Sequence, residues 1–222
     1  MLVTITSMRM KRPTVLVPLG RNRTSYRCNS ARGGNEKKLW QTVSHSFLLS
    51  PASLLAISRY NGGVLFRIRQ FEKADFDTLW RIDQACFDPQ LAYSRPEMAF
   101  YMRRPGSFTL VAEAEGSKVP GNGILGFIVA ETGRKNGHII TIDVVAEARR
   151  AGVGSALLRA AEDQLLRAGA LAVALETPVN NAAAIRFYKQ KGYFVEKTVA
   201  GYYSGQMDAL VMTKDLARLP VG

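Results

Sequence analysis

The feature that most constrains the fold is an abrupt junction between an apolar run and a basic loop that contains glycine. The run IITIDVV (139–145) has the composition of a buried strand, and ARRAGVGSALL (148–158) follows it almost directly. Amides in the first turn of a helix lack helical acceptors, so such a turn binds anions. Gly152 and Gly154 have no Cβ and would let a phosphate approach these amides. The junction predicts a phosphate- or pyrophosphate-binding loop or, on its pattern alone, a glycine turn with two solvated arginines.

Hydrophobic periodicity on both sides of this junction predicts a mixed α/β domain. Alternating or continuous apolar residues indicate strands, and apolar residues three or four positions apart indicate helices. The predicted strands are 64–69, 107–115, 123–131, 139–145, 171–177, 193–199 and 208–216, and the predicted helices are 75–87, 94–102, 153–168 and 181–191. Asn181 caps the last helix and Gly192 ends it. The order β-α-α-β-β-β-α-β-α-β-β describes a domain that starts near Gly63 and can bury a core.

Residues 1–62 differ from the rest of the chain in charge. The 222 residues carry 30 Lys/Arg and 18 Asp/Glu, a net charge of +12. Residues 1–62 contribute 10 − 1 = +9, and residues 63–222 contribute 20 − 17 = +3. Three interpretations of 1–62 stay open: an organelle transit peptide, a disordered basic tail, or a start site placed too early. We expect a cytoplasmic protein, with organelle targeting as the alternative, and no specific nucleic-acid binding by residues 63–222.

The residue types that hold metals or form disulfides are sparse. The sequence contains two cysteines, Cys28 and Cys86, and two histidines, His45 and His138, at spacings that fit neither a disulfide framework nor a metal site. We interpret the thiols as free in a reducing compartment and both histidines as structural or incidental. No apolar run approaches the ~20 residues that a membrane span needs, so no membrane partner is expected.

Two motifs together resemble the GNAT N-acetyltransferases. The glycine loop fits their motif A, (Q/R)-x-x-G-x-(G/A), which in that family cradles the coenzyme A pyrophosphate. It fits neither a Walker A loop, because no G-K-[ST] follows, nor a dinucleotide fingerprint, because Leu157 replaces its third glycine. ALETPVNNAAAIRFYKQKGYF (174–194) resembles the second half of the family's core. The resemblance runs from about residue 66 to residue 216 and implies the family's central twisted mixed sheet flanked by helices, over residues 63–222.

The resemblance implies direct transfer of acetyl from acetyl-CoA to an amine, without a metal. Glu176 matches the family's general base, which acts directly or through a water, and Tyr188, twelve residues later, matches the acid that protonates the departing CoA thiolate. Each has a plainer interpretation, a solvent-facing carboxylate at a strand end and a packing tyrosine. We find no cysteine placed to form an acetyl-enzyme.

The resemblance also implies a set of cofactor-binding residues. Ile142, Asp143 and Val144 match the strand whose backbone pairs with pantetheine, and an N–H near Val144 would polarise the thioester carbonyl. Asn181 matches an asparagine that contacts CoA. The residues that would hold the pyrophosphate are Arg150, Ala151, Gly152, Val153, Gly154 and Ser155. Arg149 occupies the Q/R position of motif A, where its side chain is interpreted as structural.

The acceptor side is most similar to the RimI-type enzymes, which acetylate the N-terminal alanine of a small-subunit ribosomal protein, and to their archaeal and eukaryotic relatives. Tyr202 and Tyr203 match paired tyrosines that flank the peptide site in these relatives, and Asp208 would assist them; the alternative is an aromatic pair packed on the core. Two segments depart from the pattern. The strand reads L-E-T-P (175–178) instead of L-E-V-R, and FDPQLAYS (87–94) lacks F-P-W-S.

We therefore expect the α-amine of a protein N-terminus as acceptor, with alanine as the leading first residue and a ribosomal protein as a candidate partner. A lysine side chain or a small-molecule amine is the alternative within the same fold. A non-catalytic CoA-binding module or a basic nucleic-acid-associated module is the rival of another class. A monomer or weak homodimer is expected.

Overall fold

The computed structural model describes residues 58–59, 65–89, 91–116, 123–203 and 205–217. The predictions for residues 1–62 lie outside the described residues, apart from residues 58–59, and so do Cys28 and His45. Within these ranges no helix is both long enough and apolar enough to cross a membrane. The same residues include no group of three or more His, Cys, Asp or Glu side chains that could hold a metal ion.

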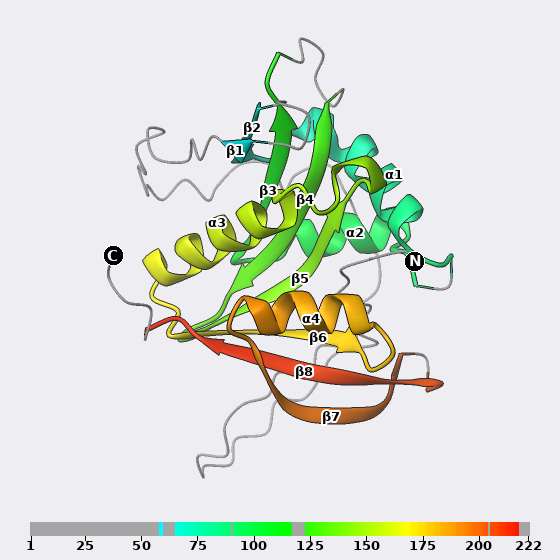
Figure 1. Ribbon diagram of the computed structural model, residues 1–222, viewed down its shortest axis with the longest axis vertical. Helices are drawn as coiled ribbons and strands as arrows, with labels where there is room; N and C mark the ends of the chain where they lie inside the picture. Colours follow the sequence, from blue (N-terminus) through cyan, green and yellow to red (C-terminus); the bar gives the residue numbers. More distant parts are fainter. Residues whose placement is uncertain (1–57, 60–64, 90, 117–122, 204, 218–222) are drawn as a thin grey trace, which may run out of the picture. The chain divides into compact units, whose positions relative to one another are not determined.

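One mixed sheet organises the described chain (Figure 1). Its strand order is β1-β2-β3-β4-β5-β6-β8-β7, and all neighbours are antiparallel except β5 and β6. The strands are β1 (Ser58–Arg59), β2 (Leu65–Gln70), β3 (Ser107–Ala114), β4 (Ile124–Thr132), β5 (Asn136–Val144), β6 (Ala172–Pro178), β7 (Phe194–Tyr203) and β8 (Met207–Asp215). The helices are α1 (Phe76–Cys86), α2 (Arg95–Arg103), α3 (Val153–Arg167) and α4 (Ala182–Gln190), with 3-10 turns at Lys73–Asp75 and Ala146–Ala148.

The element order agrees with the sequence prediction, with the two-residue β1 and the short turns added. The Asn181 cap of α4 is confirmed, because its side chain accepts a hydrogen bond from Ala184 N at 3.0 Å. The prediction that strand β7 ends at residue 199 was wrong, because the strand continues to Tyr203. Gly201 adopts φ +61° where the pairing with β8 shifts register, so a bulge carries the strand across this glycine.

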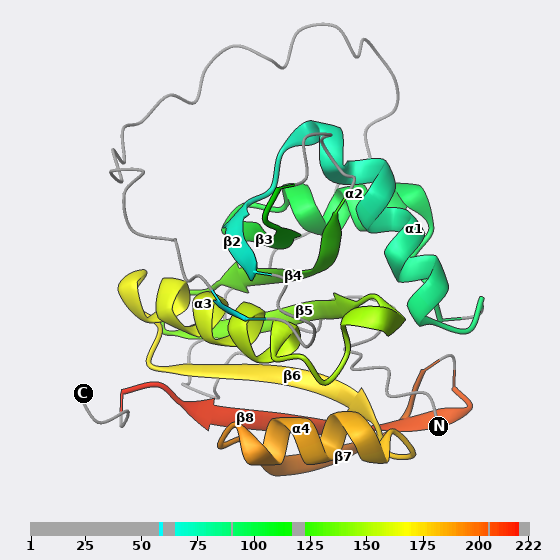
Figure 2. The same ribbon diagram turned by 45° about the horizontal axis from the view of Figure 1, so that its top comes forward.

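Each face of the sheet carries its own core. Figure 2 shows the helices that pack against the sheet from a second side. Side chains alternate between the two faces along a strand. In β4, Ile128 and Ala130 pack with α3 and α4, whereas Phe127 and Val129 pack with α1 and α2. The helices on the two faces thus hold the strands in register while leaving the strand ends open to form a site.

The parallel pair β5–β6 is joined over only part of its length. Backbone pairing runs from Asn136 to His138 on β5 and from Ala172 to Ala174 on β6. Both strands continue beyond these residues, to Val144 and Pro178, without pairing to each other, and they part visibly in Figure 1. The sheet therefore has an opening at its centre, where one edge of β5 has no strand beside it.

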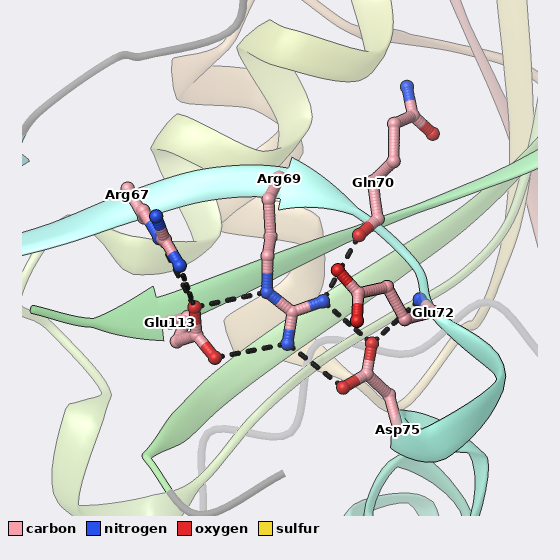
Figure 3. Close-up of polar contacts among 6 residues, drawn as sticks. All are labelled: Arg67, Arg69, Gln70, Glu72, Asp75 and Glu113. Atoms are coloured by element: carbon pink, nitrogen blue, oxygen red, sulfur yellow. Dashed lines mark hydrogen bonds and ion pairs between the residues drawn. The ribbon is translucent and has the colours of Figure 1, made fainter. Parts of the chain in front are cut away.

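A buried ion cluster ties β2 and the start of α1 to β3 (Figure 3). Arg69 donates to Asp75 at 2.7 and 2.9 Å and to Glu113 at 3.0 and 3.1 Å. Arg67 also donates to Glu113, at 2.8 Å. Burial opposes ionisation of Asp75, but the hydrogen bonds from Arg69 and from the backbone of Glu72 outweigh it and lower the pKa of Asp75. The hydrogen bond from Arg69 lowers the pKa of Glu113, against burial, so both carboxylates stay ionised at neutral pH.

We expect the substitution Glu113→Gln to lower the free energy of unfolding at pH 7 by about 1–3 kcal/mol, because it leaves the arginines with one fewer charged acceptor. A lowered carboxyl pKa adds stability above the unfolded value, 4.5 for Glu113, that is lost as pH falls through the folded value. The difference in the free energy of unfolding between wild type and Glu113→Gln, measured by urea unfolding, should therefore be smaller at pH 3 than at pH 7. Glu115→Gln, at an exposed site, is the control. An equal difference in the free energy of unfolding at both pH values would contradict the conclusion that Glu113 is an ionised partner of the arginines.

Candidate active site

The glycine loop leads into α3 through two residues with positive φ. Gly152, the N-cap of α3, has φ +89°, and Arg150 has φ +62°. Positive φ costs a side-chain-bearing residue such as Arg150 about 1 kcal/mol, and strain of this kind is concentrated at ligand sites. The side chain of Val153 belongs to the core and that of Ala151 is also buried. These two residues can therefore contact an anion only through their backbone N–H groups, and that of Val153 belongs to the first turn of α3, where amides lack helical acceptors.

A cavity of about 320 Å³ lies against this loop. Its lining combines the end of β5, the glycine loop and one side of α4. The lining residues are Cys86, Asp143, Val144, Arg149, Arg150, Gly152, Gly154, Ser155, Phe187 and Gln190. The structure thus brings six of the sequence-predicted cofactor residues to one cavity, together with Arg149. Ile142 is buried in the core beside them.

Arg149 is anchored to the protein. Its Nε donates to the carbonyl of Val144 at 3.0 Å, and its Nη2 lies 3.5 Å from the Sγ of Cys86. These contacts support the structural interpretation of its side chain and hold the end of β5 in place. Burial, together with the negative charge of Asp143, raises the pKa of the Cys86 thiol to about 12. Cys86 therefore stays protonated at neutral pH, as a structural thiol does.

A buried acid pair lies behind the cavity. Burial raises the pKa of Asp83 to about 7, although hydrogen bonds from the Tyr93 backbone and the Gln84 side chain oppose the shift. Burial and the negative charge of Asp83 raise the pKa of Asp143 well above its ordinary value. This shift favours the protonated form of Asp143, which lines the cavity.

Glu176 and His138 meet near the point where β5 and β6 part. The Nε2 of His138 lies 2.7 Å from Oε2 of Glu176, and Glu176 is only 9% exposed. Burial opposes protonation of His138, but the hydrogen bond and charge of Glu176 outweigh it and raise the pKa of His138. The interpretation of His138 as structural or incidental did not anticipate this contact. No sequence pattern signals it, because it depends on the pairing of His138 with Ala174 across the parallel strands, which places Glu176 two residues further on the same face.

Aromatic and apolar side chains pack together at the end of β7. The rings of Tyr202 and Tyr203 are 4.9 Å apart, edge to face, and Phe87 and Leu91 of the segment between α1 and α2 pack with them. Burial, then the charge of Glu176, raises the pKa of Tyr202, so its hydroxyl stays protonated next to the carboxylate. Asp208 accepts the backbone N–H of Gly201 at 2.8 Å and so holds the bulge that carries both tyrosines.

Tyr188 is fully buried among core side chains on α4. Its hydroxyl finds no hydrogen-bond partner among the described residues, and burial, then the charge of Asp143, raises its pKa. A buried polar group without a partner is costly, so its presence suggests a partner supplied by a ligand. Tyr193, which lies between α4 and β7, differs from Tyr188 because its hydroxyl has a partner and donates to Glu162 at 2.9 Å.

Comparison with known proteins agrees with this arrangement. The profile of the Acetyltransferase (GNAT) family matches residues 76–193. An uncharacterized N-acetyltransferase of Methanocaldococcus jannaschii is 33% identical over 148 residues, which cover 66% of this chain and 90% of the relative. An N-alpha-acetyltransferase of Sulfurisphaera tokodaii is 28% identical over 167 residues, covering 69% of this chain and 95% of the relative. The ribosomal-protein-S18-alanine N-acetyltransferase from Escherichia coli shares the fold, with a TM-score of 0.59 at 22% identity over 71% of this chain and 97% of that chain.

The chain therefore belongs to the GNAT acetyltransferase family, whose profile spans more than half of its length. Within that class it is an acetyl-CoA-dependent N-acetyltransferase. The family resemblance and the fold class predicted from the sequence are confirmed.

We expect Tyr188→Phe and Tyr193→Phe to have opposite consequences. Tyr188→Phe removes a hydroxyl without a protein partner, so stability should hold or rise while turnover falls. Tyr193→Phe breaks a buried hydrogen bond, so stability should fall by about 1–2 kcal/mol while turnover holds. Urea unfolding and steady-state acetyl transfer measure the two effects. Equal turnover in wild type and Tyr188→Phe would remove Tyr188 from the chemistry.

Proposed function

We propose that this enzyme acetylates the α-amine of protein N-termini by direct transfer from acetyl-CoA. The observation that carries the proposal is the buried Glu176–His138 pair at the opening between β5 and β6, with the tyrosines of β7 beside it. The name of the Sulfurisphaera tokodaii relative points to the same acceptor class. We take the alanine-first N-terminus of a ribosomal protein as the leading candidate within this class.

The pKa of the acceptor amine sets the free-energy cost of the deprotonation that the general base must assist. An amine attacks only when neutral, and an α-amine has a pKa near 8 whereas a lysine has one near 10.4. At pH 7 deprotonation costs about 1.4 kcal/mol for an α-amine and roughly 4.6 kcal/mol for a lysine, at about 1.36 kcal/mol per unit. A carboxylate in contact with a histidine suits the smaller task, because both are side chains that act as general bases.

The residues of the loop and of β5 fit acetyl-CoA by their chemistry. Arg150 and the first-turn amides of α3 would take the pyrophosphate, and the unpaired edge of β5 at 142–144 would pair with the extended pantetheine. Bound there, acetyl-CoA supplies a thioester carbonyl, which a backbone N–H near Val144 would polarise. Asn181 would contact the cofactor while its side chain also caps α4.

In this scheme each reactive group of the chain handles a proton. Glu176 accepts the proton of the acceptor amine, directly or through one water, and shares it with His138 across their 2.7 Å contact. The hydroxyl of Tyr188 donates a proton to the leaving sulfur, which would be the missing partner of this buried group. Tyr202 and Tyr203 flank the first residues of the peptide, and Asp208 keeps them in position through Gly201.

The acceptor is tested with a peptide panel. We expect the full-length enzyme to acetylate the α-amine of peptides that begin with Ala or Ser, and to leave unmodified a peptide with a blocked N-terminus and one internal lysine. Tandem mass spectrometry locates the added acetyl group. Acetyl on the lysine alone would move the function to a lysine acetyltransferase of the same fold. Transfer to no peptide would sink the proposal and favour a small-molecule amine.

The base pair is tested with a double-mutant cycle. We expect Glu176→Gln to lower kcat by about 10²–10⁴-fold with the CoA dissociation constant unchanged, because only proton transfer is lost. His138→Gln should cost a similar factor, and the double variant little more than either, because the two groups act as one unit. Glu196→Gln, on the exposed side of β7, is the matched control. Losses that multiply in the double variant would show that the two residues act independently.

A further inference from the structure

A second carboxylate lies on the far side of the His138 ring. Glu131 pairs with His138 across strands β4 and β5, and its Oε1 is 3.9 Å from Nδ1 of the ring. The other oxygen, Oε2, is 3.3 Å from Nη1 of Arg104. Arg104, Glu131, His138 and Glu176 thus form one line of charged side chains, here called the charged row, that starts at the end of α2 and crosses β4, β5 and β6.

The position of Arg104 in this row is fixed by the turn between α2 and β3. Arg104 is the C-cap of α2, and its carbonyl accepts the N–H of Ser107 at 2.9 Å. Gly106 has φ +87° and accepts the N–H of Thr132 at 2.9 Å. A Cβ on Gly106 would lie 2.7 Å from the carbonyl oxygen of Thr132, so only glycine allows this close approach to the end of β4. The turn therefore holds Arg104 against Glu131.

The row leads from the interior towards solvent. The side chain of Glu176 is 11% exposed, that of His138 is 20% exposed and that of Glu131 is 21% exposed. When Nε2 of a neutral imidazole donates to Glu176, Nδ1 is an acceptor that faces a second acceptor. A proton on Nδ1, or a water in the 3.9 Å gap, resolves this conflict. The His138 ring lies between two carboxylates, so it can take up a proton at one ring nitrogen and release a proton from the other.

We infer that Glu131 is a positioning residue that orients the His138 ring and receives the acceptor's proton on its way to water, with Arg104 as its counter-charge. This inference rests on the proposed function. Acetylation of an ammonium group forms one C–N bond and breaks one C–S bond. One proton goes to the CoA sulfur and another must leave the enzyme. In the tautomer whose Nδ1 carries the proton, Nε2 takes the second proton from Glu176 and Nδ1 releases its own proton towards Glu131, so the charged row gives a path outward.

The two outer residues of the row act on His138 with opposite sign. The charge of Glu131 raises the pKa of His138, and the charge of Arg104 lowers it, within a balance set by burial and by Glu176. Among the described residues, Glu176 from β6, Glu131 from β4 and Arg104 from the end of α2 are the charged groups that act on this ring. Removing Glu131 should lower the pKa of His138, and removing Arg104 should raise it.

Histidine NMR measures this effect without activity. The full-length chain has two histidines, so the His45→Gln background leaves His138 as the only ring signal. In that background we expect Glu131→Gln to shift the ring titration to lower pH and Arg104→Gln to shift it to higher pH. Glu115→Gln, at an exposed position on the end of β3, should leave it unchanged. Unchanged titration in both row variants would overturn the inference, and thermal melts confirm that each variant is folded.

Kinetics supplies the second readout. The resting base must be unprotonated, so the acidic limb of kcat/KM should move in the same direction as the ring titration in each variant. The loss of kcat should be smaller than the loss caused by Glu176→Gln, and the KM for acetyl-CoA should stay constant. A fall in kcat with an unmoved acidic limb in both variants would indicate a structural role only. If wild type acetylates no α-amine, the proposed function fails. The NMR titration still shows in that case whether Glu131 and Arg104 act on the His138 ring.

Discussion

The early parting of strands β5 and β6 is the constraint on which the rest of the structure depends. A parallel pair that stayed joined along its whole length would close the sheet and leave no site at its centre. Here backbone pairing stops at His138 and Ala174, although both strands continue. The free edge of β5 leads to the glycine loop on one side of the opening, and β6, which carries Glu176, lies on the other side. In the proposed function, acetyl-CoA binds along β5 and the acceptor approaches from the side of β6.

The electrostatics of the two sides differ in a way that suits this division. The side of the opening at the glycine loop has the exposed Arg150 and the first turn of α3, so it offers an anion positive charge. The side at β6 has the carboxyl group of Glu176 in contact with His138. Buried charges are costly unless they are paired. Glu176 has such a partner in His138, and the side chain of Arg149 is held by the carbonyl of Val144.

Local patterns in the sequence predicted most of the fold and six of the residues that line the cavity beside the glycine loop. The strand–glycine–helix junction and the Asn181 cap depend on neighbouring residues, so the sequence alone identified them. The His138–Glu176 contact joins residues 38 positions apart on two strands, and periodicity carries no information about which strands pair. For the same reason, the sequence did not predict that Asp83 lies near Asp143 or that Arg104 lies beside Glu131. Strand β7 was predicted too short because the glycine at 201 reads as a terminator, whereas a bulge absorbs it.

The buried carboxyl group of Asp83 gives the stability of the fold a pH dependence opposite to that of the reactivity of the acceptor amine. Its ordinary pKa is 3.8, and burial raises it to about 7 in the folded protein. The folded state therefore holds a proton that the unfolded chain has already released, and stability declines as pH rises between these two values. An α-amine is half deprotonated only near pH 8. The pH range that makes an α-amine reactive therefore lies above the range in which the proton on Asp83 stabilises the fold.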